Sequence, residues 1–218
     1  MKKKIKKNAK LKKLKKPEKP KKNSSKKEVK KPFRIFVISG PGGAGKTTLV
    51  NELFQNKHLK NNCTKAITVT TREMRPQEVE GKDYYFVDKG EFAYLNKKNF
   101  FIENEKIADN YYGTPKLFLN FAKKLKKDLA LCIDVKGGMY LKKNLKADKI
   151  VTIFITVPNE KDLLRRMKKR EDEPAAVKKR FDLAKEEMKY AKKYDHIIIN
   201  RTLKKALKET EAIIKNSS

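Results

Sequence analysis

The stretch SGPGGAGKTT, residues 39–48, decides the fold, and it directly follows the largely apolar run FRIFVI at 33–38. Its core, Gly40–Thr47, matches the pattern G-x-x-x-x-G-K-[ST], in which glycines allow successive backbone N–H groups to face a phosphate. The apolar run is typical of a buried strand. The residues after the loop, about 47–54, are predicted to form a helix whose N-terminus adds partial positive charge.

This glycine loop is predicted to bind the phosphates of ATP. Lys46 would reach the β- and γ-phosphates, and the Thr47 hydroxyl would be a ligand of Mg²⁺. The predicted ATP-binding residues of the loop are Gly40, Pro41, Gly42, Gly43, Ala44, Gly45, Lys46, Thr47 and Thr48.

Positive charge is distributed unevenly along the 218 residues, whose formal net charge is +31. Residues 1–32 hold seventeen lysines, two glutamates, three prolines and no aromatic residue. They have too little apolar surface to offset the chain entropy lost on folding, so we predict a disordered lysine-rich tail before one domain at 33–218. We interpret the tail as a solvated appendage; the alternative hypothesis is a weak attachment to RNA or the ribosome.

Membrane insertion and secretion are not predicted. No apolar run approaches the roughly 18 residues of a membrane span, and the N-terminus lacks the apolar stretch of a signal peptide. Cys63 and Cys132 lie far apart and do not have the spacing of a metal site. We therefore expect reduced thiols and a cytoplasmic location.

Arginine is informative because this chain uses lysine by default: only eight of its 57 basic residues are arginines. Six of the eight fall in two clusters, at 72–75 and 165–180. Arginine offers a flat, permanently charged fork that matches a phosphate with two parallel hydrogen bonds. The clusters therefore indicate phosphate binding outside the glycine loop.

Strand and helix patterns alternate along the domain. Strands are predicted at about 33–38, 66–70, 84–87, 100–107, 129–133, 150–157 and 196–199. Helices are predicted at about 47–54, 91–95, 115–126, after Gly138, and at 160–169, 175–190 and 203–214. This alternation favours an α/β fold with a mostly parallel sheet flanked by helices, while the strand-rich stretch near 67–114 indicates an inserted lobe.

Further motifs carry a resemblance to a known family. The stretches T-T-R-x-x-R at 70–75 and N-Y-Y-G-T at 110–114 follow the glycine loop, and further arginines lie beyond residue 160. From about Phe33 to the C-terminus, the chain resembles the guanylate kinases, which transfer a phosphoryl group from ATP to GMP. The resemblance implies a P-loop kinase fold. Its parts would be a core (33–66, 115–160 and 190–218), a small mixed-strand GMP-binding lobe (67–114) and a helical lid (161–189).

The resemblance also implies residue roles. The GMP phosphate would be bound by Arg72, Arg75, Tyr84 and Tyr112. The guanine side of the pocket would be lined by Thr68, Glu103, Thr114 and Asp134. Catalysis would depend on Lys46 and on the lid arginines Arg166, Arg170 and Arg180, because phosphoryl transfer needs electrostatic stabilisation of spreading charge. Asn200 would lie near the adenine of ATP.

The chemistry of the base agrees with these roles. Guanine presents two adjacent donors, N1–H and N2–H₂, and the Glu103 carboxylate can accept from both. Adenine presents a bare N1 lone pair there, which would face another acceptor. Thr114 can donate to guanine O6, where adenine has an amine. We therefore expect GMP, and also dGMP, to be strongly preferred over AMP.

The chain departs from the family pattern at several positions: the lid between Arg170 and Arg180 is about one residue short, and Arg201 follows Asn200 where an acid is usual. Two further departures concern the predicted phosphate and metal sites. Gly42 stands where serine is usual, and Cys132 stands where the family commonly has the first aspartate of an Asp-x-Asp pair. If that acid organises water around Mg²⁺, metal affinity or rate is weaker here. Asp134 keeps the second acid.

Three other interpretations stay open at this point. One is a guanylate-kinase-like binding module without catalysis, another is a basic RNA-associated protein whose tail matters most, and the third is a P-loop kinase with a different acceptor. Modules that have lost catalysis usually lose the loop lysine or the lid arginines, whereas this chain has both.

Overall fold

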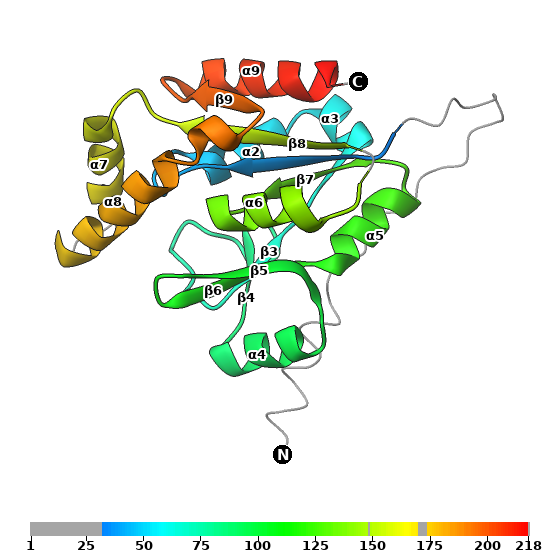
Figure 1. Ribbon diagram of the computed structural model, residues 1–218, viewed down its shortest axis with the longest axis horizontal. Coiled ribbons are helices and arrows are strands. Elements are labelled where there is room, and N and C mark those ends of the chain that lie inside the picture. Colours follow the sequence, from blue (N-terminus) through cyan, green and yellow to red (C-terminus); the bar gives the residue numbers. More distant parts are fainter. Residues whose placement is uncertain (1–31, 148, 170–173, 218) are drawn as a thin grey trace. The chain divides into compact units, whose positions relative to one another are not determined.

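The computed structural model describes residues 32–147, 149–169 and 174–217. Five parallel strands form its central sheet in the order β2-β7-β1-β8-β9 (Figure 1). These strands are β1 (Arg34–Ser39), β2 (Cys63–Lys65), β7 (Asp128–Cys132), β8 (Lys149–Thr156) and β9 (His196–Ile199). β1 lies in the middle and all six of its residues are buried, as expected of a parallel strand covered on both faces.

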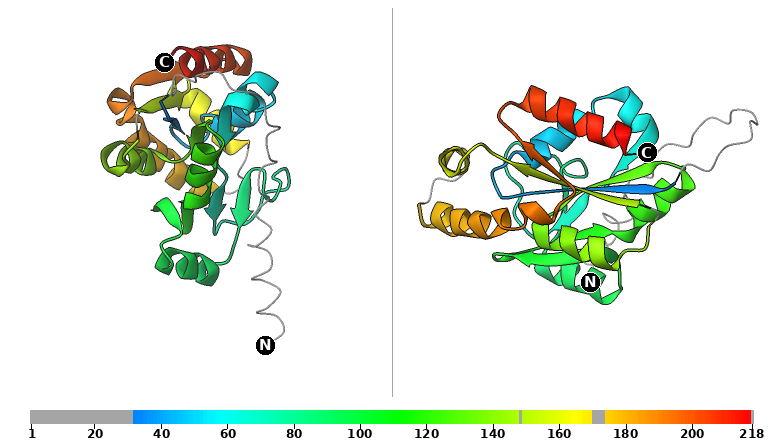
Figure 2. Two further views of the ribbon diagram at one scale, coloured as in Figure 1. Left: turned by 90° about the vertical axis from the view of Figure 1, so that its right-hand side faces the viewer. Right: turned by 45° about the horizontal axis from the view of Figure 1, so that its top comes forward.

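Helices cover both faces of this sheet (Figure 2). On one face lie α2 (Lys46–Leu53), α3 (Lys57–Asn62) and α9 (Leu203–Asn216), and on the other lie α5 (Lys116–Lys124) and α6 (Val135–Asn144). The predicted α/β class, with a parallel sheet flanked by helices, is confirmed.

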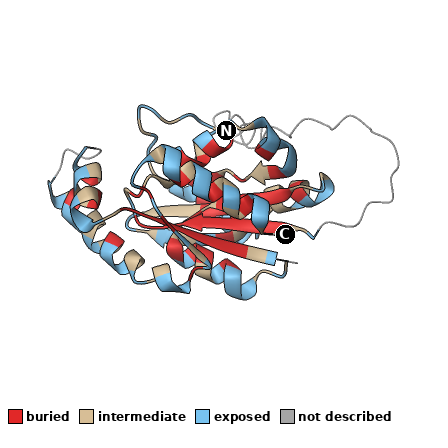
Figure 3. Ribbon diagram, turned by 90° about the horizontal axis from the view of Figure 1, so that it is seen from above, coloured by how far each residue is buried: buried red, intermediate tan, exposed pale blue. Residues whose placement is uncertain are grey.

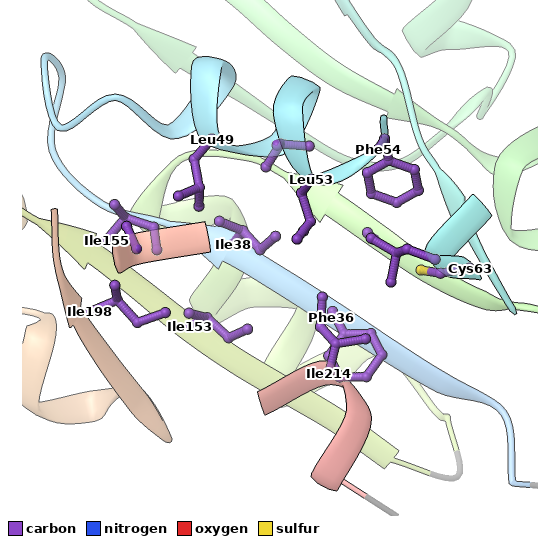
Figure 4. Close-up of a cluster of buried hydrophobic side chains, with 14 of the residues drawn as sticks. Phe36, Ile38, Leu49, Leu53, Phe54, Cys63, Ile153, Ile155, Ile198 and Ile214 are labelled. Atoms are coloured by element: carbon purple, nitrogen blue, oxygen red, sulfur yellow. The ribbon is translucent and has the colours of Figure 1, made fainter. Parts of the chain in front are cut away.

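Alternate residues of β1 supply two separate hydrophobic cores, because successive side chains of a strand point to opposite faces. Phe36 and Ile38 pack with Leu49 and Leu53 of α2 (Figure 4). Residues 35 and 37 pack instead in the core that α5 and α6 share with β7. Figure 3 shows the middle strands of the central sheet buried, and β1, β7 and β8 are buried along most of their length. This burial holds the end of β1 and the loop after it in place.

A second, mixed sheet has the order β4-β3-β6-β5. Its strands are β3 (Thr68–Thr70), β4 (Tyr84–Phe86), β5 (Phe101–Ile107) and β6 (Asn110–Pro115), and α4 (Lys89–Lys97) accompanies them. β3 runs parallel to β4 and antiparallel to β6. Phe92 of α4 stacks on Phe101 of β5, with ring centroids 4.7 Å apart, so the helix and the sheet share an aromatic core.

Between β8 and β9 the chain forms α7 (Glu160–Lys168), α8 (Pro174–Met188) and the short 3₁₀ helix η1 (Ala191–Lys193). Residues of α7 and α8 form a small hydrophobic cluster with the end of β8, namely Val157, Leu163, Met167, Val177 and Ala184. This helix pair corresponds to the segment expected to form the lid. None of the helices in the described ranges is long and apolar enough to cross a membrane.

Some predicted elements are wrong in extent. Residues 66–70 were expected to form one strand, but the chain forms β2 at 63–65 in the central sheet and β3 at 68–70 in the second. α6 begins at Val135 rather than after Gly138, because the Asp134 side chain caps it by accepting the Gly137 N–H at 2.7 Å. The sequence patterns also missed α3 and β6.

Candidate active site

The glycine loop leaves β1 with a backbone conformation that requires glycine. Gly40, Gly43 and Gly45 have φ values of 143°, 83° and 90°. A Cβ atom at Gly40 would lie 2.0 Å from the backbone oxygen of Ile155 on the neighbouring strand β8. The loop therefore starts in direct contact with the central sheet, and no side chain fits at its first position.

Lys46, the first residue of α2, folds back over this loop. Its Nζ donates to the backbone oxygens of Gly40 and Pro41, at 2.5 and 3.0 Å. The ammonium group is thereby placed on the rim of a cavity of about 230 Å³. Thr47 lines the same cavity, while Thr48 is exposed.

Asn200 and Arg166 contact the glycine loop through the backbone oxygen of Ala44. The Asn200 side-chain amide donates to Ala44 O at 2.9 Å, and the Arg166 guanidinium donates to Ala44 O and Asn200 O at 3.3 and 2.8 Å. Both residues were predicted at the nucleotide site. In this structure they contact the loop itself.

The cavity brings together the glycine loop, the second sheet and α8. Thirteen of the predicted site residues line it: Gly42, Gly43, Gly45, Lys46, Thr47, Thr68, Arg72, Arg75, Tyr84, Glu103, Tyr112, Asp134 and Arg180. Segments that are distant in sequence therefore meet around one space. Arg170, which was also predicted here, lies outside the described residues.

α8 reaches the second sheet across this cavity. Arg180 lines the cavity, and the neighbouring Lys179 pairs with Asp109 at the β5–β6 turn, with Nζ and Oδ2 3.2 Å apart. This ion pair is exposed, so its contribution to stability is small, on the order of 0–1 kcal/mol. Its position nevertheless shows that α8 and the second sheet are in contact.

Arg72 is held in place by Glu78, a residue that the sequence patterns did not identify. The Arg72 Nη2 lies 2.7 and 2.9 Å from the two carboxylate oxygens of Glu78, which also accepts the backbone N–H of Arg75 at 3.0 Å. One carboxylate thus organises both arginines of the T-T-R-x-x-R stretch. Its spacing, three residues after Arg75, is the signal that sequence reasoning could have used.

Tyr84 joins the two sides of the cavity. Its ring packs edge-on against Tyr112, with centroids 6.2 Å apart, and the Arg72 guanidinium lies 5.4 Å from its centroid. Burial raises the pKa of the Tyr84 hydroxyl, and the nearby Thr47 hydroxyl opposes this shift. A neutral phenol of the second sheet therefore lies beside the start of α2.

Glu103 lines the cavity and is only 6% exposed. The buried Thr114 hydroxyl donates to its Oε1 at 2.6 Å. Burial raises the pKa of Glu103 to about 7; the Thr114 hydrogen bond opposes this shift, and the negative charge of Asp134 adds to it. A carboxylate in this environment is a strong acceptor for a ligand that can supply N–H donors.

Asp134 has two roles beside Glu103. It caps α6, as described above, and its carboxylate lines the cavity. Burial raises its pKa, while the N–H groups of Gly137 and Lys136 and the ammonium groups of Lys46 and Lys136 lower it. The α6 backbone approaches closely here, because a Cβ atom at Gly137 would lie 2.7 Å from Glu103 Oε2.

The cavity offers few metal ligands of its own. Within the described ranges, no group of three or more His, Cys, Asp or Glu side chains is arranged to hold a metal ion. Thr47, Cys132 and Asp134 line the cavity together, and burial raises the pKa of the Cys132 thiol. A cation in this space would depend on ligand oxygens in addition to protein oxygens.

Glu187 of α8 is a cavity residue that the sequence patterns missed. Its Oε2 accepts the backbone N–H of Gly42 in the glycine loop at 3.1 Å. It lies seven residues after Arg180, so the two side chains share one face of the helix. That helical spacing is a signal in the sequence, but only the fold shows which face is turned toward the loop.

Comparisons with known proteins agree on one family. A family model described as guanylate kinase matches residues 32–217. The guanylate kinase of Rickettsia conorii is 40% identical over 181 residues, covering 83% of this chain and 77% of that protein. The guanylate kinase of Mycoplasma genitalium is 39% identical over 188 residues, covering 86% and 77%. The crystal structure of guanylate kinase from Anaplasma phagocytophilum matches with a TM-score of 0.69 at 29% identity, covering 86% of this chain and 87% of that one.

Proposed function

The chain belongs to the guanylate kinase family and phosphorylates GMP to GDP with ATP as the donor, and we propose that the transfer takes place in the cavity described above. The observation that carries this location is the meeting of three groups around one space: the glycine loop with Lys46, the arginine pair of the second sheet, and Glu103. We propose in addition that dGMP is an acceptor.

The donor phosphates are assigned to the glycine loop. Its left-handed glycines turn backbone N–H groups toward a phosphate, and the N-terminus of α2 adds partial positive charge. Lys46 would exchange its bonds to Gly40 O and Pro41 O for phosphate oxygens. Asn200 and Arg166 support this role by fixing Ala44 of the loop.

The acceptor phosphate is assigned to Arg72, Arg75, Tyr84 and Tyr112. Arg72 and Tyr84 are in contact, and Glu78 orients the arginine pair. Because Tyr84 and Thr47 line the same cavity, Tyr84 would place the acceptor phosphate next to the donor loop. Such positioning, together with positive charge, supplies most of the catalysis in phosphoryl transfer.

The guanine base is assigned to the part of the cavity that Glu103 lines. Glu103 would accept N1–H and N2–H₂, and Thr68 and Asp134 would line the same space. Thr114 now donates to Glu103. It would donate a hydrogen bond to guanine O6 if its hydroxyl rotated when the base binds.

The transferring phosphoryl group is assigned to Lys46 and the lid arginines. Arg180 lines the cavity from α8. Arg166 contacts the loop backbone, and we propose that it keeps the loop in shape while Arg180 approaches the phosphate charge. Core, lobe and lid would correspond to the central sheet, the second sheet and the α7–α8 pair.

Mg²⁺ is proposed as the metal cofactor. The residues fit, because Mg²⁺ usually keeps several waters and takes one or two protein oxygens plus substrate phosphates. Thr47 would hold it, with Asp134 in the same cavity. The thiol of Cys132 replaces a hard oxygen ligand, so the protein contributes little to metal affinity. Bound Mg²⁺ would neutralise phosphate charge.

A coupled assay of ADP release with GMP, dGMP, AMP, CMP and UMP tests the acceptor. We expect kcat/KM for GMP to exceed that for AMP by as much as ~10⁴-fold, because adenine leaves the Glu103 carboxylate unpaired. dGMP should also be used, since the assigned residues contact only base and phosphate. Equal use of GMP and AMP would contradict the assignment of Glu103.

The lysine-rich segment and the location in the cell are separate proposals. Residues 1–31 lie outside the described residues, so the hypothesis of weak RNA or ribosome attachment rests on charge alone. Removing residues 1–32 should leave turnover unchanged and abolish any retention on RNA at low salt. If the shortened protein is still retained on RNA, the domain and not the lysine-rich segment binds RNA. A cytoplasmic location is supported by Cys63 and Cys132, whose sulfurs are not joined in a disulfide.

A further inference from the structure

Glu187 places an acidic group on a loop that is assigned to phosphates. Its Oε2 accepts the N–H of Gly42, the third residue of the glycine loop, at 3.1 Å. A phosphate oxygen would make the same kind of charge-assisted hydrogen bond with a loop amide. In the nucleotide-free protein, a carboxylate of the chain itself therefore occupies part of the anion-binding surface.

The charges around Glu187 fit this interpretation. Burial raises the pKa of its carboxyl group. The ammonium of Lys46, the N–H of Gly42 and the ammonium of Lys136 oppose that shift, while the negative charge of Asp134 adds to it. The carboxylate is thus held by the groups that attract phosphate, Lys46 and the loop amide. A nucleotide phosphate in the loop would compete for both groups and would repel the carboxylate.

Glu187 also belongs to the helix that carries a catalytic arginine. Arg180, Leu183 and Glu187 follow one another at helical spacing on one face of α8, and all three line the cavity. The contact between Glu187 and Gly42 therefore ties this helix to the loop. Its loss would free α8 to adjust its position over the phosphates.

We propose that Glu187 is an internal competitor of ATP: its carboxylate occupies the Gly42 amide in the empty enzyme and is displaced when ATP binds. Displacement couples occupation of the loop to the position of α8 and Arg180. This inference rests on the proposed ATP site. The opposing interpretation is that Glu187 supports the loop in its binding conformation, and the two interpretations predict effects of opposite sign.

The experiment compares ATP binding by the full chain and by Glu187→Gln. Calorimetric titration with MgATP in the absence of GMP avoids turnover. Glutamine keeps the shape of the side chain but removes its charge, so we expect the Kd for ATP to fall about fivefold or more. The Kd for GMP should not change. Unchanged or weaker ATP binding by Glu187→Gln would overturn the proposal.

Glu186→Gln is the matched control. Glu186 is the preceding residue of α8, is exposed, and pairs with Lys189 at 2.7 Å. Its neutralisation changes the net charge equally, and we expect an effect on the Kd for ATP within about twofold. An equal gain in ATP affinity for both variants would overturn the proposal, because general charge repulsion would then explain the result.

Lys46→Ala separates this inference from the proposed ATP site. If Lys46→Ala binds ATP as tightly as the wild type, the location of the ATP site is wrong. If Lys46→Ala weakens ATP binding but Glu187→Gln brings no gain, only the role of Glu187 is wrong. A crystal structure of the ATP complex gives an independent check. We expect the Glu187 carboxylate to have left Gly42 N–H, and a retained hydrogen bond would overturn the proposal.

Discussion

Lys46→Ala is expected to lower kcat at least about a thousandfold while GMP binding stays within about twofold of the wild type. The ammonium group lies on the loop at the start of α2, bonded to Gly40 O and Pro41 O. It would stabilise the charge of the transferring phosphoryl group, and alanine leaves that charge without a partner. GMP is assigned to the second sheet and to Glu103, so its binding does not depend on this side chain.

The measurement is a coupled assay of ADP release at saturating ATP and GMP, with GMP binding followed by calorimetry. Lys46→Met retains the length of the side chain without its charge, and we expect it to be as inactive as alanine. Lys57→Ala, at the exposed start of α3, serves as the control for loss of a lysine and should retain full activity. A Lys46→Met variant that retains a tenth of the wild-type kcat would refute an electrostatic role.

Glu103→Gln is expected to lower kcat/KM for GMP by roughly 10²–10³-fold, the effect of leaving buried polar groups unpaired. An amide offers one acceptor and turns its NH₂ group toward the donors of guanine. kcat/KM for AMP should not fall. The preference for GMP over AMP is therefore lost only because GMP is used less efficiently. Glu105→Gln, which removes a charge from the same strand, is the matched control. An equal loss of kcat/KM for GMP and for AMP would show that Glu103 does not distinguish guanine from adenine.

The pH dependence provides a second test of Glu103. Its pKa is raised to about 7 in the free enzyme, and only the ionised carboxylate can accept both guanine donors. Between about pH 7 and pH 6, kcat/KM for GMP should therefore fall toward tenfold per pH unit, and more steeply below 6, where the GMP phosphate also takes up a proton. Glu103→Gln should lose this inflection and keep only that of the GMP phosphate, near 6. An inflection at pH 7 in both proteins would assign it to another group.

The same raised pKa predicts how stability depends on pH. A carboxyl group whose folded-state pKa lies above its unfolded value stabilises the fold below the unfolded pKa, and this contribution is lost as pH rises through the folded pKa. For Glu103 the window runs from 4.5 to about 7. Glu103→Gln should therefore melt at a higher temperature than the wild type at pH 8, with a smaller difference at pH 4.5. Reduced activity could then not be attributed to unfolding.

The parts of the fold that could be predicted from the sequence are those determined by local pattern. The apolar run at 33–38, the glycine loop and the helix after it predicted β1, the loop and α2 with shifts of one residue. β9 was predicted with its observed bounds, 196–199, because its isoleucines lie between polar residues. In each case neighbouring residues alone carry the information.

Other parts depend on pairing partners that are distant in sequence. Residues 63–70 divide between two sheets because Cys63–Lys65 pairs with β7, whereas Thr68–Thr70 pairs with β4 and β6. Strand propensity at Ala66 or Ile67 cannot show this change of partner. β6 was missed for a related reason: its polar, aromatic and glycine residues form a strand only against β3 and β5.

The site was predicted from family motifs more than from geometry. The arginines, Lys46 and the carboxylate of Glu103 could be located in this way, because each is part of a short, spaced pattern. Glu78 and Glu187 were not located in this way. The spacing of Glu78 after Arg75 is a local signal that could have been used, whereas the partner of Glu187, Gly42, is distant in sequence and only the fold shows the contact. A carboxylate in a basic chain is a useful hint, but only folding decides what it contacts.

The close approach of Gly40 to Ile155 has a consequence for saturation mutagenesis. The atom that excludes any side chain at position 40 belongs to the backbone of β8 in the central sheet, not to the nucleotide. A selection for soluble expression alone, with no demand for turnover, should therefore reject every replacement at this position. Intolerance to change at Gly40 would thus report on assembly of the sheet, and it would persist in a protein already inactivated elsewhere.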